Sequence, residues 1–244
     1  EADKKVLLTG ITGYIANHCA VELLKNGYSV RGSLRNISKS DKIVNAIKKE
    51  VDPKDNLEFC ELNLLNDEGW NDAAKGCDFV MHVASPFINI EPKDENEYIR
   101  PAVDGTMRAL KAAKSAGVKR VVLTSSMVSM LGNADKSIDV DAETWTNIKG
   151  KNVSAYSKSK TLAEQAAWNF INAQTDNTKT ELAVVNPGPV FGPSLSGDLS
   201  GASMSMFTQM MQGKMPMVPQ ASINMSDVRD IAKIHVLALE NKEA

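Results

Sequence analysis

The sequence predicts an α/β fold in which helices cover both faces of a parallel sheet. Six short runs rich in valine, leucine and other apolar residues alternate with longer segments of helical periodicity. The first run leads through two glycines directly into a helical segment, which is typical of doubly wound sheets. The length of 244 residues is enough for one sizeable core. We therefore expect one large domain.

Composition and charge exclude several classes of protein. The net charge is only -2 and no basic block occurs, so we expect no nucleic-acid partner. No apolar run approaches the roughly 20 residues that cross a bilayer. The N-terminus is not a signal peptide, so we expect a cytoplasmic protein without a membrane partner. Cys19, Cys60 and Cys77 lack the spacing of metal ligands and are interpreted as buried apolar side chains, so no metal is expected.

The first predicted strand, residues 5–9, ends in a glycine-containing turn. The segment reads Thr9-Gly10-Ile11-Thr12-Gly13-Tyr14-Ile15-Ala16, and apolar residues with helical spacing follow it. Glycine permits backbone torsions and close approaches that a side chain forbids, and a helix N-terminus offers unpaired N–H groups to a pyrophosphate. The turn therefore predicts a dinucleotide site. The alternative is a glycine-rich connection without a ligand.

The second predicted strand, residues 28–34, is followed by basic side chains. An acid about 20 positions after the glycine turn favours NAD, whereas an arginine accommodates the extra phosphate of NADP. The segment after the strand has no acid before Asp41, so Arg35 is the candidate for this phosphate, with Arg31 and Lys42 as helpers. The alternative is that all three are solvated surface cations, and for Lys42 alone this alternative is favoured.

The middle of the chain continues the alternation. Helices are expected at 40–51, 70–75 and 95–116, and strands at 57–62, 79–84 and 120–126. His82 lies inside an apolar run and is interpreted as a satisfied core residue. Ser125 and Ser126 end the last of these strands, where open α/β sheets bind their ligands. Capping of the strand end accounts for Ser125, but less well for Ser126 when Tyr156 is considered.

A tyrosine and a lysine stand four residues apart at the start of the next helix. At this spacing Tyr156 and Lys160 lie one above the other on the same helix face. A nearby cation favours the phenolate, so Lys160 should lower the pKa of Tyr156 from its usual value of roughly 10. Tyr156 would then be a proton donor to a carbonyl oxygen. The alternative is one buried and one solvated helix residue without chemistry.

The last part of the chain contains a strand, a loop and two helical segments. The strand is expected at 181–186 and is followed by a proline-rich loop at 187–193. Methionines between 204 and 211 form an apolar cluster, which is usually core and would also suit a pocket wall. A final amphipathic helix is expected at 227–239.

Together these motifs resemble the extended short-chain dehydrogenase/reductases. The shared pattern is the glycine turn, Thr124-Ser125-Ser126, Tyr156-x-x-x-Lys160 and Asn186-Pro187-x-x-Val190-x-Gly192-Pro193. Within that family, His82-Val83-Ala84-Ser85-Pro86 and the stretch 157–168 look like the dihydroflavonol reductase, cinnamoyl-CoA reductase and methylglyoxal/aldehyde reductase branch. The resemblance covers nearly the whole chain. It implies a Rossmann-type doubly wound parallel sheet with an incomplete small C-terminal substrate-binding part.

The resemblance also implies an NADP(H)-dependent reductase of a small aldehyde or ketone. Ser126, Tyr156 and Lys160 match the catalytic residues. In that family the serine bonds the carbonyl oxygen, the tyrosine donates the proton, and the lysine lowers the tyrosine pKa and holds the nicotinamide ribose. Arg35 matches the position that selects NADP, with Lys42 as a candidate helper. The other cofactor-binding candidates are Gly10, Thr12, Gly13, Tyr14, Ile15, Asn63, Leu64, Val83, Ala84, Ser85, Ser125, Pro187 and Val190, together with Tyr156 and Lys160.

The resemblance divides the chain into three parts. We expect an NADP-binding Rossmann domain at 1–193, a partial substrate-binding region at 194–225 and a helix at 226–244 that packs on the Rossmann domain. The chain starts without Met and stops before the end of the family's pattern. We therefore expect a fragment, monomeric or homodimeric, that binds NADPH but reduces carbonyl compounds poorly on its own.

Three departures from the family pattern bear on the substrate and the cofactor. Asn63 stands where the family usually has Asp, and Met130 stands where plant flavonoid reductases carry Asn. The cinnamoyl-CoA reductase signature is absent from 151–155, so neither a flavonoid nor a coenzyme A thioester is expected. Met130, Phe87 and Met204 predict an apolar pocket.

Two alternative functions remain at the level of sequence. One is a nucleotide-sugar epimerase or dehydratase of the same superfamily, which usually retains NAD, and the basic residues after the second strand argue against it. The other is a non-catalytic cofactor sensor. Relatives of that type typically lack the tyrosine and lysine pair, which is intact here.

Overall fold

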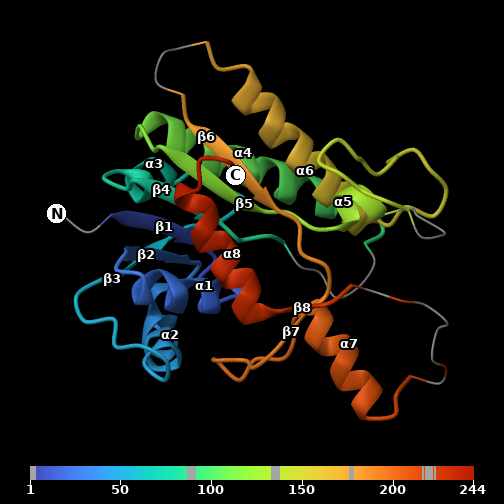
Figure 1. Cartoon of the computed structure of the whole chain (residues 1–244), viewed down its shortest axis with the longest axis horizontal. Coiled ribbons are helices and arrows are strands. Elements are labelled where there is room, and N and C mark those ends of the chain that lie inside the picture. Colours follow the sequence, from blue (N-terminus) through green and yellow to red (C-terminus); the bar gives the residue numbers. More distant parts are fainter. Residues whose placement is uncertain are drawn as a thin grey trace.

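Six parallel strands form a central sheet with helices on both faces (Figure 1). The computed structural model describes residues 4–86, 92–132, 138–175, 179–215, 217, 222 and 224–244. The strands are β1 (Lys5–Thr9), β2 (Ser29–Leu34), β3 (Leu57–Glu61), β4 (Phe79–His82), β5 (Arg120–Thr124) and β6 (Glu181–Val185). Their order is β3-β2-β1-β4-β5-β6, which is the order of a doubly wound dinucleotide-binding sheet. The predicted Rossmann-type fold is confirmed.

The helices connect these strands in the expected places. They are α1 (Tyr14–Lys25), the 3-10 helix η1 (Ile37–Lys39), α2 (Ser40–Ile47), α3 (Trp70–Ala74), α4 (Asn96–Ser115), α5 (Val128–Leu131), α6 (Ala155–Asn172), α7 (Ala202–Met211) and α8 (Val228–Glu240). The four-residue helix α5 was not predicted. Nor was the short parallel pair β7 (Val190–Phe191) and β8 (Ser226–Asp227), beside which α7 extends away from the sheet (Figure 1).

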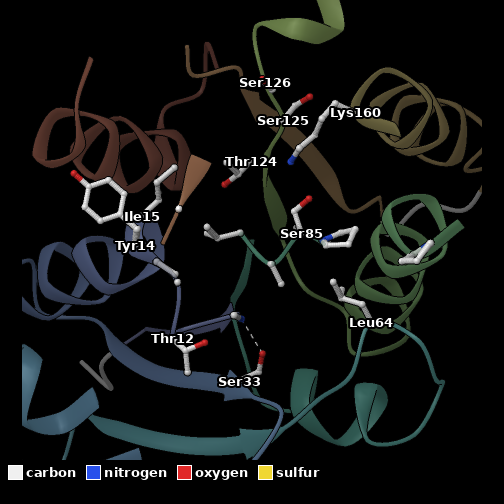
Figure 2. Close-up of a pocket in the computed structure, with 18 of the residues that line it drawn as sticks. Thr12, Tyr14, Ile15, Ser33, Leu64, Ser85, Thr124, Ser125, Ser126 and Lys160 are labelled. Carbon is white, nitrogen blue, oxygen red and sulfur yellow. Dashed lines mark hydrogen bonds between the residues drawn. The ribbon is translucent and has the colours of Figure 1, made fainter. Parts of the chain in front are cut away.

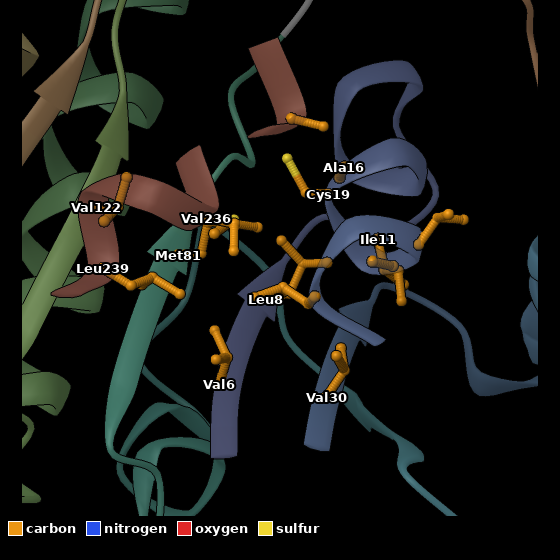
Figure 3. Packing of buried hydrophobic residues seen from close by; sticks show 14 of the residues in the cluster. Val6, Leu8, Ile11, Ala16, Cys19, Val30, Met81, Val122, Val236 and Leu239 are labelled. Carbon is orange, nitrogen blue, oxygen red and sulfur yellow. The ribbon is translucent and has the colours of Figure 1, made fainter. Parts of the chain in front are cut away.

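Alternate residues of the buried strands enter two separate cores. On one face Val6 and Leu8 of β1 pack with α1, α2 and α8 (Figure 3). On the other face Leu7 packs with α3, α4 and α6. Strands that are buried on both faces read as continuous apolar runs, which is why the sequence predicted them well. Cys19 belongs to the first core, and burial raises the pKa of its thiol, as expected for an unreactive cysteine.

β4 and β5 end two residues earlier than predicted, at His82 and Thr124. After β4, the backbone N–H groups of Val83 and Ala84 donate to the side-chain hydroxyl of Thr9, at 3.1 Å each, and not to a backbone carbonyl as in a strand ladder. The residues beyond both strands therefore form loops at the carboxyl edge of the sheet. No helix in the described part of the chain is both long enough and apolar enough to span a membrane.

Candidate active site

A cavity of about 660 Å³ lies at the carboxyl edge of the sheet, where the loops after β1 and β4 meet. This is the point at which the strand order reverses, and open α/β sheets bind ligands there. Figure 2 shows Thr12 and Ser33 at one end of it and Ser125, Ser126 and Lys160 at the other. The predicted site residues that line it are Gly10, Thr12, Gly13, Tyr14, Ile15, Arg35, Asn63, Leu64, Val83, Ala84, Ser85, Ser125, Ser126, Tyr156, Lys160, Pro187 and Val190.

The glycine turn closes one end of this cavity. Gly10 has a φ of +68°, and a Cβ built on it would lie 2.9 Å from both Cα and Cβ of Ala84. The Gly10 N–H donates to the hydroxyl of Ser33 at 3.0 Å, which fixes the turn against β2. Gly13 precedes α1 without a side-chain cap, and the first turn of α1 contains no acid. The positive end of the helix dipole therefore faces the cavity unneutralised, which suits a pyrophosphate.

A buried hydroxyl–imidazole pair holds the loop that faces this turn. Thr9 accepts the N–H groups of Val83 and Ala84, so its own proton is directed to His82 Nδ1, 2.8 Å away. Burial, helped by the positive charge of Lys160, lowers the pKa of His82 to about 3. His82 is thus a neutral core residue, as predicted, but it is only half satisfied. Among the described residues its Nε2 has no hydrogen-bond partner.

The three basic residues after the glycine turn have different environments. Arg35 is exposed at the cavity, and its guanidinium makes no ion pair with any residue that the structure describes. Arg31 does not lie at the cavity as the predicted helper of Arg35. Its Nε donates to Glu58 at 2.7 Å and its Nη1 to the carbonyl of Ala73 at 2.7 Å, so it caps the end of α3 instead. Lys42 does not line the cavity either. The pKa of Asp198 is lowered mainly by hydrogen bonds from Ser200, and the charge of Lys42 contributes a smaller lowering.

The three candidate catalytic residues come from two elements. Ser126 follows β5, and Tyr156 and Lys160 lie one turn apart near the start of α6. The Ser154 side chain accepts the backbone N–H of Ser157 and so caps this helix. The ammonium of Lys160 stands over the ring of Tyr156, with Nζ 5.9 Å from the ring centroid. The sequence pattern and the fold thus bring a hydroxyl, a phenol and an ammonium to one end of the cavity.

Comparison with known proteins agrees with this geometry. Residues 6–244 match the model of the NAD dependent epimerase/dehydratase family. The chain belongs to this family. It is 35% identical to cinnamoyl-CoA reductase CAD2 of Medicago truncatula over 98% of this chain and 73% of that protein. It is 32% identical to the NADPH-dependent methylglyoxal reductase GRE2 of Saccharomyces cerevisiae, over 98% of this chain and 75% of that protein.

A solved structure shows the same relationship. Gre2 of Candida albicans in complex with NADPH superposes with a TM-score of 0.80 at 30% identity, covering 99% of this chain and 75% of that chain. The predicted membership in the extended short-chain dehydrogenase/reductases is therefore confirmed, as is the resemblance to the cinnamoyl-CoA and methylglyoxal reductase branch.

The acid–base properties of this reductase site differ from the expectation. Burial raises the pKa of Tyr156, the Ser126 hydroxyl opposes this, and Tyr98 adds to it. The predicted lowering by Lys160 is wrong for this arrangement, because desolvation dominates and the ammonium stands over the ring. Burial also lowers the pKa of Lys160 to about 8, although the charge of Glu164 acts in the opposite direction.

Several lining residues of the reductase cavity were not predicted. They are Ser33, Leu62, Trp70, Glu97, Pro101, Gly188 and Ser203. Ser33 precedes Arg35 by two positions, and its role in holding Gly10 carries no local sequence signal. The hydroxyl of Tyr14 donates to the carbonyl of Gly192 at 2.9 Å, so part of the lining is fixed by contacts between distant segments.

The predicted apolar wall is only partly described. Met204 of α7 lines the cavity, whereas Met130, half-buried on α5, does not. Phe87 lies outside the described residues, as does much of the segment 215–225. Within the described residues, no group of three or more His, Cys, Asp or Glu side chains is placed to hold a metal ion.

Proposed function

We propose that this protein reduces a small aldehyde or ketone to an alcohol with NADPH. NADP(H) is the cofactor of the relatives on which this rests, in both the methylglyoxal reductase of yeast and the Gre2 complex. One observation carries the proposal: Ser126, Tyr156 and Lys160 line the same cavity as the Gly10 turn and Arg35. The acid–base groups and the phosphate-binding groups thus share one cleft, as a cofactor with a reactive nicotinamide requires.

The residues at the glycine turn fit a dinucleotide. Ala84 lies so close to Gly10 that no side chain fits at position 10, and the start of α1 offers N–H groups to a pyrophosphate. The exposed guanidinium of Arg35 at the cavity is suited to the 2′-phosphate that distinguishes NADPH from NADH. Lys42 does not line the cavity, so the proposal assigns the 2′-phosphate to Arg35 alone. When bound, NADPH supplies the hydride that the carbonyl carbon receives.

The proton is the protein's contribution. The Ser126 hydroxyl would hold the carbonyl oxygen, and Tyr156 would give its proton to that oxygen as negative charge develops there. With its pKa raised by burial, Tyr156 keeps this proton at neutral pH. Lys160, whose pKa is about 8, is still largely charged there and stabilises the phenolate that remains. Protonation from bulk water then restores the phenol.

The substrate class follows from the lining near these groups. Met204 and Pro187 give that part of the cavity an apolar wall, which favours a carbonyl compound with a hydrophobic side. A charged nucleotide-sugar, the substrate of the alternative epimerase or dehydratase, would find no described cation there except Lys160. We also propose the division at 1–193, 194–225 and 226–244, with the middle part as the substrate side.

The test is a panel of aldehydes and ketones, assayed by loss of the nicotinamide absorbance with NADPH and with NADH. Turnover of an apolar aldehyde with NADPH, abolished in Tyr156→Phe, is expected. A matched panel of nucleotide-sugars tests the alternative. Turnover of a nucleotide-sugar with no carbonyl reduction would reject the proposal. Tight NADPH binding without any turnover would favour the non-catalytic sensor.

A further inference from the structure

A buried carboxylate lies directly behind the candidate catalytic residues. Glu164 is one helical turn beyond Lys160 on α6 and only 7% exposed. Its Oε2 accepts three hydrogen bonds, from Ser125 Oγ at 2.5 Å, Ser129 Oγ at 2.8 Å and Asn186 Nδ2 at 2.8 Å. These donors stand after β5, on α5 and after β6. One carboxylate oxygen therefore joins α6 to three other segments.

The same donors hold the backbone of Ser126. Its carbonyl oxygen lies 2.8 Å from Ser129 Oγ, whose single proton is shared between this carbonyl and Glu164 Oε2, and 3.2 Å from Asn186 Nδ2. Asn186 also directly precedes Pro187, which lines the cavity. Ser126 is thus held through two groups that Glu164 itself binds. Displacing the carboxylate would release the peptide that carries the Ser126 hydroxyl.

Glu164 also acts on the ammonium. Lys160 is 8% exposed, and the charge of Glu164 partly offsets the lowering of its pKa by burial. A second cavity, of about 10 Å³, is lined by both side chains. The other titratable groups beside Lys160 are Tyr156 on its own helix and His82 at the end of β4. His82 is neutral above pH ~3, so among the described groups Glu164 is the negative charge that keeps Lys160 protonated.

We propose that Glu164 is a positioning residue of the reductase centre, which holds Ser126 in place and supplies the negative charge opposite Lys160. This inference rests on the proposed function. A purely structural carboxylate would explain the hydrogen bonds from three segments. It would not require the carboxylate to stand one turn from the buried ammonium on the same helix. The two readings differ in what they predict for the titration of Lys160.

The test compares Glu164→Gln with the matched control Glu181→Gln. Glu181 forms an ion pair with Arg120 at the opposite end of β5 and β6, so its variant also loses a carboxylate, but far from the site. The Lys160 titration is followed by NMR of ¹³C-labelled lysines, with Lys160→Met to assign the signal. In Glu164→Gln we expect the midpoint to fall by about one pH unit and turnover at neutral pH to fall at least tenfold. In Glu181→Gln neither should change.

Ser129→Ala separates the two roles and serves as the test if Glu164→Gln does not fold. It removes the hydroxyl that contacts both Glu164 Oε2 and the Ser126 carbonyl and keeps the carboxylate, so turnover should fall severalfold while the Lys160 titration stays unchanged. An unchanged Lys160 titration and turnover within twofold in folded Glu164→Gln would overturn the inference. So would losses of turnover that follow stability alone, equally in Glu164→Gln and Glu181→Gln. If the parent chain reduces no carbonyl compound, the proposed function fails, and the Lys160 titration still decides whether Glu164 sets the charge.

Discussion

Replacing Gly10 by alanine tests how closely the glycine turn is packed against the loop after β4. Two costs add at this position. A φ of +68° costs an L-residue roughly 1–2 kcal/mol. The new Cβ would also lie 2.9 Å from two atoms of Ala84, one of them backbone, and such overpacking costs roughly 1–3 kcal/mol. We expect Gly10→Ala to lower the free energy of unfolding by about 2–5 kcal/mol.

Gly27 offers a matched control. It has a φ of +80°, and a Cβ built on it would meet nothing within 4 Å. Gly27→Ala should therefore show only the backbone cost, roughly 1–2 kcal/mol. Ala84→Gly in the Gly10→Ala background removes one of the two overlapping atoms and should restore part of the difference. The backbone cost would remain in the double variant.

The assay is urea unfolding of the four chains, with NADPH titration by fluorescence alongside it. Because Gly10 borders the cavity, Gly10→Ala should also weaken the binding of NADPH. Each ~1.4 kcal/mol of binding free energy lost through displacement of the turn raises the Kd tenfold, and we expect a loss of at least tenfold. Gly27→Ala should leave the affinity unchanged. Equal losses of stability in Gly10→Ala and Gly27→Ala would refute the reasoning, because they would show that Ala84 moves aside without cost.

The remaining predictions concern the charged and acidic groups. Tyr156→Phe should lower turnover by about 10²–10⁴-fold with little change in NADPH affinity, and near-normal turnover would remove Tyr156 from the mechanism. Arg35→Ala should weaken NADPH at least tenfold but NADH little, with Lys42→Ala as the control without effect; equal losses for both cofactors would make Arg35 structural. The pKa of Lys160 is lowered from 10.5 to about 8, so between these values the unfolded chain binds more protons. Native stability should therefore rise with pH in this window relative to Lys160→Met in urea unfolding, and a constant difference would contradict the buried charge.

The sheet could be predicted because most of its strands have a recognisable local sequence pattern. The central strands β1, β4 and β5 are apolar runs buried on both faces, and the strands are separated from one another by segments of helical periodicity. The pair β7 and β8 carries no such signal, since two residues each are too short for a pattern and their pairing joins positions 190 and 226. Helix α5 could not be predicted for the same reason, because four residues are too few for a helical pattern. Their placement depends on bonds to distant segments, such as that of Ser129 with Glu164.

The candidate site was predictable where one short sequence motif contains all the residues that act together. The glycine turn and the pair of Tyr156 and Lys160 fall into this class, because fixed spacings place each set on one turn or one helix face. Arg31 was assigned wrongly because the register of β2 and β3, which sets it opposite Glu58, is not legible in the sequence. The burial of Glu164 was not predictable, because it depends on Ser125, Ser129 and Asn186 from other segments.

Burial acts on both acid–base groups of the site in a way that favours a late proton transfer. It raises the pKa of Tyr156 and lowers that of Lys160, so it penalises the phenolate and the ammonium alike. In the proposed mechanism the phenol would therefore keep its proton until a carbonyl oxygen beside it becomes strongly basic. The charge of Glu164 partly offsets this penalty on the ammonium. In the proposed mechanism the ammonium of Lys160 would stabilise the phenolate that proton transfer leaves, and the charge of Glu164 supports that ammonium before the substrate arrives.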